Sequence, residues 1–311
     1  MRSRVTVFAP ATVANLGVGF DILGLALDAP GDEVSVEPLE TPGIELAAVT
    51  GDGGQLPTDP AKNTACIAAR ETLRAVGAPT GVRIWLNKGL PLASGLGSSA
   101  ASAAAAAVAV NELFGAPLSV GDLLPACIEA EAAVSGRHAD NVAPALWGGI
   151  VLVMGLEARD IHRLPIPDNL YLALITPDIA VPTAKARAIL PKDIPLRTLV
   201  QQTAQVAALV HALHTNDLQL LGQAMHDNLI MPARAGLIPG IGQAIDAAHE
   251  AGALVTTISG AGPTLCAVCN SMATAQTVIT AFSHVYERLG MAYQTRVARP
   301  SKLGAAVKIE T

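Results

Sequence analysis

The spacing of hydrophobic and polar positions predicts short strands and helices in the first half of the chain. Residues 4–8 and 33–37 alternate as strands, and residues 59–79 follow a helical period that ends at Gly77 and Pro79. Residues 82–91 alternate again, and strong helix formers then run from the glycines near position 97 to Gly115. This order predicts a strand, a glycine-rich loop and a helix in direct succession.

The remaining pattern mixes helices and strands without a regular alternation. It predicts a helix over 120–134, a polar turn over 135–144, and strands over 148–154 and 171–177. Three more helices are predicted over 196–214, 218–231 and 273–289. A strand, a glycine turn and a second strand fall within 255–270, and a closing strand within 295–299. Because strict strand–helix–strand units are missing, the pattern indicates an α+β protein.

Composition and charge narrow the functional classes. Apolar residues make up 51% of the 311 positions, but no apolar run reaches the ~18 residues that a membrane-spanning helix needs. No basic segment with a cleavage site precedes the apolar residues near the start, so we expect a soluble, cytoplasmic protein. The net charge of −6 disfavours nucleic-acid binding, since that function needs a basic surface. Small-molecule chemistry is favoured.

The four cysteines give no metal or disulfide signal. Cys66 and Cys127 stand alone, while Cys266 and Cys269 form a single CxxC inside an apolar, strand-like run. A structural zinc site normally needs four ligands, so we predict that all four are reduced core residues.

The loop over residues 91–101 has the properties of a phosphate-binding turn. Gly95 and Gly97 let backbone N–H groups approach an anion, and the helix predicted from Ser98 points its positive end at the same place. Ser98 and Ser99 add hydroxyls, one of which could bind a phosphate-bound Mg²⁺. The alternative is a simple glycine turn capped by serine before an alanine-rich helix.

Two other nucleotide motifs fit this loop less well. A Walker loop requires a lysine after the glycines, whereas Lys88 precedes them. Gly95, Gly97 and Ala100 satisfy the dinucleotide pattern GxGxxA, but that motif needs a second strand ending in Asp or Glu about 20 residues later. Here Gly115 leads to another predicted helix, which makes a dehydrogenase the minority interpretation.

The segment PLASGLGSSAA at 91–101 resembles the PxxxGLGSSAA signature of the GHMP kinases. The segments at 9–27, 135–144, 181–191, 231–240 and 259–264 are similar to those of the members that phosphorylate homoserine. One departure is Val13, where the family usually has serine or threonine; this puts in doubt a hydroxyl contact at that position.

The resemblance implies a two-domain GHMP kinase fold of the α+β class with its site between the domains. Residues 1–165 would form the N-terminal ATP-binding domain, similar to domain 2 of ribosomal protein S5, and residues 166–311 a C-terminal domain of ferredoxin-like topology. It implies ATP-dependent phosphorylation of L-homoserine in threonine biosynthesis, in the cytoplasm, by a homodimer. The alternatives are a kinase of this family for another alcohol, such as mevalonate or a sugar, and a nucleotide-binding regulator without catalysis.

The resemblance also assigns residues to the nucleotide. Asn63 and Lys88 would flank the adenine, while Ser99 and Glu131 would bind Mg²⁺ through a hydroxyl and a carboxylate. The predicted ATP-binding positions are Asn63, Lys88, Pro91, Leu92, Ala93, Ser94, Gly95, Leu96, Gly97, Ser98, Ser99, Ala100 and Ala101.

An amino-acid substrate with a hydroxyl needs three kinds of partner. Arg187 and Arg234 offer guanidinium groups for a carboxylate, and Asp21 with Asn15 can receive an ammonium group. Asn141 and Thr183 could orient the hydroxyl. Asp140 could act as a base or fix the turn, and the resemblance implies that these kinases work by positioning, without a dedicated base. His138 would hold the same turn, and Gly260 with Gly262 would form a second glycine loop that closes on the substrate, or a tight hairpin.

Overall fold

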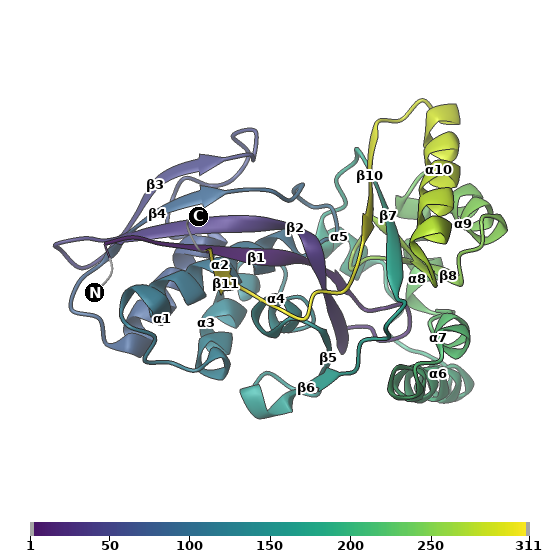
Figure 1. Ribbon diagram of the computed structural model, residues 1–311, viewed down its shortest axis with the longest axis horizontal. Helices are drawn as coiled ribbons and strands as arrows, with labels where there is room; N and C mark the ends of the chain where they lie inside the picture. The colour runs from purple at the N-terminus through teal and green to yellow at the C-terminus, as the bar shows by residue number, and fades with distance from the viewer. Residues whose placement is uncertain (1–2, 309–311) are drawn as a thin grey trace.

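A mixed sheet forms the centre of the N-terminal half in the computed structural model, which describes residues 3–308 (Figure 1). Within these residues the sheet has seven strands, in the order β11-β1-β2-β4-β3, and β5 pairs with both β2 and β6. The bounds are β1 Val5–Ala14, β2 Leu23–Pro38, β3 Ile44–Thr50, β4 Val82–Asn87, β5 Ile150–Val153, β6 Ile161–Leu164 and β11 Ala306–Val307.

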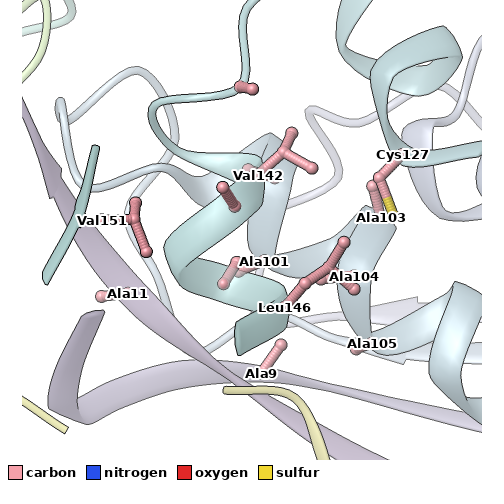
Figure 2. Close-up of a cluster of buried hydrophobic side chains, with 14 of the residues drawn as sticks. Ala9, Ala11, Ala101, Ala103, Ala104, Ala105, Cys127, Val142, Leu146 and Val151 are labelled. Atoms are coloured by element: carbon pink, nitrogen blue, oxygen red, sulfur yellow. The ribbon is translucent and has the colours of Figure 1, made fainter. Parts of the chain in front are cut away.

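Four helices cover one face of this sheet: α1 Thr64–Val76, α2 Ser98–Leu113, α3 Val120–Ala132 and α4 Val142–Trp147 (Figure 1). The central helix, α2, is built almost entirely of buried small residues. Figure 2 shows Ala101, Ala104 and Ala105 of α2 beside Ala9 of β1 and Leu146 of α4. Small side chains allow close approach of helix and sheet, so the N-terminus of α2 is held in a well-packed frame.

The C-terminal half contains a second sheet with the order β10-β7-β9-β8, all of its pairs antiparallel. Taken along the chain this is the strand order 4-1-3-2, which confirms the predicted ferredoxin-like topology. The bounds are β7 Tyr171–Pro177, β8 Val255–Ile258, β9 Leu265–Cys269 and β10 Tyr293–Ala298, with helices α5 Thr183–Ala188, α6 Leu196–Thr215, α7 Leu218–Ala224, α8 Ile230–Arg234, α9 Ile241–Glu250 and α10 Met272–Arg288. Short 3₁₀ turns lie at Ala158–Asp160 and Ala235–Leu237.

Two local predictions are wrong. The single helix expected over 218–231 is broken into α7 and α8, because the Asp227 carboxylate accepts backbone N–H groups of Leu229 at 2.8 Å and Met231 at 2.6 Å and so starts a new helix. The polar turn expected over 135–144 ends early, since α4 begins at Val142. The alternating pattern also missed β3, β6 and β11.

The end of the chain returns to the first sheet after completing the second. Strand β11 pairs with β1 at Val7 and Val307, and the Ser301 N–H donates to the Ala26 carbonyl at 2.8 Å. The boundary predicted at residue 165 lies between β6 and β7 and stays a prediction.

The cysteines occupy the core, as predicted: all four are free and buried. Burial raises the pKa of the Cys66 thiol to about 12 and that of Cys269 to about 11, so neither is reactive at neutral pH. Within residues 3–308, no helix is both long enough and apolar enough to span a membrane.

Candidate active site

A cavity of about 380 Å³ lies where the two domains meet, and most residues predicted for the site line it. Four predicted nucleotide positions do not line it: Leu96, Ala100 and Ala101 are buried in the core beneath, and Pro91 lies at the start of the loop. The predicted residues that line it are Asn15, Asp21, Asn63, Lys88, Leu92, Ala93, Ser94, Gly95, Gly97, Ser98, Ser99, Glu131, His138, Asp140, Asn141, Thr183, Arg187, Arg234 and Gly260.

The phosphate-type loop leads into the uncapped N-terminus of α2. Gly97 is the N-cap residue with φ of 65°, and it has no side chain that could cap the first turn. The Ser98 Oγ is buried and has no hydrogen-bond partner within residues 3–308. A helix start with unpaired N–H groups and an unpaired hydroxyl is suited to binding an anion such as phosphate.

The loop glycines are needed because other groups pack against them. A Cβ atom at Gly97 would lie 1.9 Å from the Thr12 Oγ1, and Gly97 also has a positive φ. The Thr12 hydroxyl donates to the Asn141 Oδ1 at 2.7 Å, and the Thr12 N–H donates to the Leu96 carbonyl at 3.0 Å. Val13 put a hydroxyl contact at its own position in doubt, and the hydroxyl of Thr12, one position earlier, was not predicted.

Residues of the second domain donate hydrogen bonds to backbone carbonyl groups of the phosphate loop. The Ser259 hydroxyl donates to the Gly95 carbonyl at 2.6 Å, and the Thr264 N–H donates to the Ser94 carbonyl at 3.1 Å. Gly95 has a φ of 83°, and a Cβ there would lie 2.4 Å from the Ser259 carbonyl oxygen. The turn at 259–264 therefore contacts the phosphate loop directly. The sequence predicted a glycine loop that closes on the substrate, and that role stays a prediction.

A hydroxyl and a carboxylate meet beside the start of α2. The Ser99 hydroxyl donates to the Glu131 Oε2 at 2.8 Å, and the Ser135 hydroxyl donates to the Oε1. Burial raises the pKa of Glu131, although these two hydrogen bonds oppose the shift. Two oxygen ligands this close to a phosphate-type loop fit Mg²⁺, which prefers oxygen and completes its shell with phosphate and water.

Two oppositely charged residues that were predicted to bind the substrate, Asp21 and Arg187, form an ion pair with each other. The Arg187 guanidinium donates to both oxygens of Asp21, each at 2.9 Å, and its side chain is 34% exposed. Arg234 is buried and donates to the Gly260 carbonyl at 2.7 Å and to a backbone carbonyl of α5 at 3.2 Å. Both guanidinium groups lie over the ring of Phe20, at 5.2 and 5.3 Å from its centroid. Phe20 was not singled out from the sequence, because an aromatic in a glycine-rich segment gives no such signal.

Asn15 supports Asp21. Its Oδ1 accepts the Asp21 N–H at 3.2 Å, and its Nδ2 donates to the Gly260 carbonyl at 3.1 Å. Both residues have positive φ angles, 74° for Asn15 and 62° for Asp21, a strained conformation that is common at functional sites. The His138 Nδ1 lies 3.7 Å from the Asp21 Oδ2 and so belongs to the same group.

Asp140 is buried among acidic neighbours. Burial raises the pKa of its carboxyl to about 7, and the nearby carboxylates of Asp21 and Glu131 contribute to the shift. The next residue, Asn141, accepts a hydrogen bond from the Thr12 hydroxyl. Thr183, the first residue of α5, also lines the cavity.

The two residues predicted to flank adenine, Asn63 and Lys88, form hydrogen bonds within the protein. The Asn63 Oδ1 accepts the Ala65 N–H at 3.1 Å and so caps α1. The Lys88 side chain is 1% exposed, and its ammonium group contacts Asp32 and donates to the Ser98 carbonyl at 2.9 Å. This geometry favours a supporting role for Lys88 beneath the loop over direct contact with a base.

Known proteins are similar in sequence to most of this chain. The models for the GHMP kinase N-terminal and C-terminal domains match residues 63–149 and 209–288. The homoserine kinase of Chlorobium phaeobacteroides (strain BS1) is 44% identical over 300 residues, covering 92% of this chain and 94% of that protein. The chain belongs to the GHMP kinase family. The homoserine kinase of Arabidopsis thaliana is 47% identical to this GHMP kinase over 274 residues, covering 86% of this chain and 74% of the relative.

Solved structures agree with the fold of this GHMP kinase. A crystal structure of homoserine kinase from Cytophaga hutchinsonii superposes with a TM-score of 0.95 at 43% identity and covers 99% of this chain and 98% of its own. A mevalonate kinase from L. major, solved with R-mevalonate, reaches a TM-score of 0.74 at 18% identity over 97% of this chain and 98% of its own, which shows the shared fold alone.

The raised pKa of Asp140 predicts a pH-dependent loss of stability. A carboxyl whose pKa rises from 3.8 to about 7 on folding favours the folded state below about pH 4, and this contribution is lost as pH rises through about 7. Asp140→Asn should therefore match wild type near pH 4 and exceed its unfolding free energy at pH 8 by up to about 4 kcal/mol. Urea unfolding across this pH range measures the difference, with exposed Asp193→Asn as the control. A constant difference at all pH values would contradict the assignment.

Proposed function

We propose that this GHMP kinase transfers the γ-phosphoryl group of ATP to the hydroxyl of L-homoserine. The observation that carries the proposal is a single cavity lined by both an uncapped helix start and a paired aspartate and arginine, in a chain more than 40% identical to homoserine kinases. Phosphoryl transfer depends mainly on positioning and charge neutralisation, and this cavity supplies both.

The loop and the first turn of α2 would hold the nucleotide phosphates. The uncapped N–H groups and the unpaired Ser98 hydroxyl offer donors to phosphate oxygens. When bound by Ser99 and Glu131, Mg²⁺ would neutralise phosphate charge during transfer. Since helix and sheet fix these donors in advance, little reorganisation is needed when charge develops.

Homoserine would replace the contact between Asp21 and Arg187 with one contact to each of them. Its ammonium group would take the Asp21 carboxylate, held by Asn15, and its carboxylate would take the guanidinium groups of Arg187 and Arg234. A substrate with both charges leaves neither protein charge unpaired. A substrate with one charge leaves a partly buried partner without compensation, which is costly.

The hydroxyl would attack the γ-phosphorus while ADP leaves. Asn141 and Thr183 line the cavity and would orient the attacking oxygen. The hydroxyl proton would pass to Asp140, because a carboxyl with pKa about 7 is poised to gain a proton near neutral pH. His138 and Gly260 would shape the walls around this group.

A kinase for another alcohol remains the second candidate, because mevalonate kinase has the same fold. The paired charges favour the amino acid, since mevalonate carries no ammonium group for Asp21. The cytoplasmic location, the homodimer and the place in threonine biosynthesis stay predictions from the sequence.

The substrate class is tested by ADP release in a coupled assay with homoserine, mevalonate, galactose and shikimate. We expect Mg²⁺-dependent turnover with homoserine and at most trace activity with the others. Turnover of another alcohol without homoserine would reject the proposal.

Arg187 should contribute mainly to homoserine binding. Arg187→Met removes the bidentate donor, so KM for homoserine should rise about 10- to 100-fold while KM for ATP changes little. Lys185→Met is the matched control, since Lys185 is an exposed cation on the same helix. An equal rise in both KM values would contradict a substrate-binding role.

Glu131 should set the Mg²⁺ requirement. Glu131→Gln keeps the shape of the side chain but removes its charge, so the Mg²⁺ concentration at half-maximal rate should rise about tenfold, equivalent to about 1.4 kcal/mol. Glu129→Gln serves as the control, because Glu129 lies on the same helix and is 47% exposed. Identical Mg²⁺ titrations for the two variants would rule out Glu131 as a ligand.

A further inference from the structure

A buried ion pair lies beneath the phosphate loop. Asp32 comes from β2 and Lys88 follows β4; the exposed fractions of their side chains are 0% and 1%. Ser102, in the second turn of α2, donates to the Asp32 Oδ2 at 2.7 Å and accepts from the Lys88 Nζ at 2.8 Å. The catalytic proposal above uses neither Asp32 nor Ser102.

The pair is attached to both ends of the loop. The Asp32 Oδ1 accepts the N–H groups of Gly89 at 3.1 Å and Leu90 at 3.2 Å, just before the loop begins. The Lys88 ammonium donates at 2.9 Å to the carbonyl of Ser98, the first residue of α2, where the irregular part of the loop ends. One salt bridge therefore fixes the distance between the entry and the exit of the loop.

Stability alone does not account for such a pair. Two charges taken out of water lose hydration that their mutual attraction only partly repays, and well-packed apolar side chains often serve a core equally well. Fully bonded polar groups do, however, hold backbone segments in one arrangement. The contacts of Asp32 and Lys88 fall on backbone atoms that flank the loop.

The hydrogen bond from Lys88 to the Ser98 carbonyl also affects the neighbouring Ser99 N–H donor. Its carbonyl belongs to the same peptide unit as the Ser99 N–H, which lies in the uncapped first turn of α2. A cation on the oxygen of an amide polarises that amide and strengthens hydrogen bonding by its N–H.

We propose that Lys88 and Asp32 are positioning residues for the nucleotide: they clamp the two ends of the phosphate loop, and Lys88 polarises the Ser98–Ser99 peptide so that the Ser99 N–H donates more strongly to phosphate. The inference rests on the proposed nucleotide site. A lysine of this kind works from behind the loop through the backbone, whereas a Walker lysine reaches the phosphates with its own side chain.

The test compares ADP affinity with homoserine affinity in a variant that removes both charges. In Lys88→Met/Asp32→Asn, the Asn side chain keeps an acceptor for Gly89 and Leu90, and no charge is left unpaired. Isothermal titration calorimetry with Mg²⁺ and ADP should show about tenfold weaker binding, the size of one hydrogen bond of about 1.4 kcal/mol. KM for homoserine should stay within about twofold of wild type, because the substrate wall is untouched.

The single variant Lys88→Met separates folding from binding. It leaves the Asp32 carboxylate buried without a partner, so its melting temperature should fall well below that of the double variant. If the double variant melts like wild type and binds ADP equally well, Lys88 has no positioning role. Equal weakening of ADP and homoserine would also overturn the proposal, since that indicates general loosening.

Ser102→Ala provides the test if the double variant does not fold. It removes one hydroxyl that contacts both Lys88 and Asp32. ADP binding should weaken about threefold, which is a smaller effect than the loss of one full hydrogen bond. Unchanged ADP affinity in this variant would overturn the inference. Failure of the wild-type protein to bind ADP at all would instead reject the proposed function.

Discussion

The hydrogen bonds between the turn at 259–264 and the carbonyl groups of the phosphate loop are the constraint on which the site depends. Ser259 and Thr264 of the second domain bind the carbonyls of Gly95 and Ser94. With these acceptors engaged, the loop is held against the second domain while the first turn of α2 keeps its N–H groups uncapped. The same turn positions Arg234, which donates to the Gly260 carbonyl at 2.7 Å. Phosphate-binding and substrate-binding groups are thereby fixed in one frame.

The parts of the fold that follow from local pattern could be predicted from the sequence. The amphipathic helix α1 and the alanine-rich α2 formed close to where their periodicity and end signals indicate. The break at Asp227 was missed, because apolar residues keep a helical spacing on both sides and only the bonding of that carboxylate ends one helix and starts the next. Strand β11 was also missed, since two residues carry no period.

Most residues that line the cavity could be predicted from the sequence, but the contacts between them could not. Nearly all of the residues that were predicted from motifs line one cavity. The spacing of the motifs cannot show that Asp21 and Arg187, 166 positions apart, bind each other. The same limit hid Thr12 and Phe20, whose neighbours are set by packing between distant segments. Lys88 was expected near a base, and only the fold shows that its charge is buried against Asp32.

The pairing of β11 with β1 has a consequence for biosynthesis of the protein on the ribosome. Val7 and Val307 lie on adjacent strands, so β1 gains this neighbour only after about 300 further residues have been translated. Until then, the nascent N-terminal domain exposes the backbone of β1 to other chains. Residues 306–307 therefore cover a strand edge that β1 forms much earlier in translation, and a chain that stops before them would carry that edge unpaired.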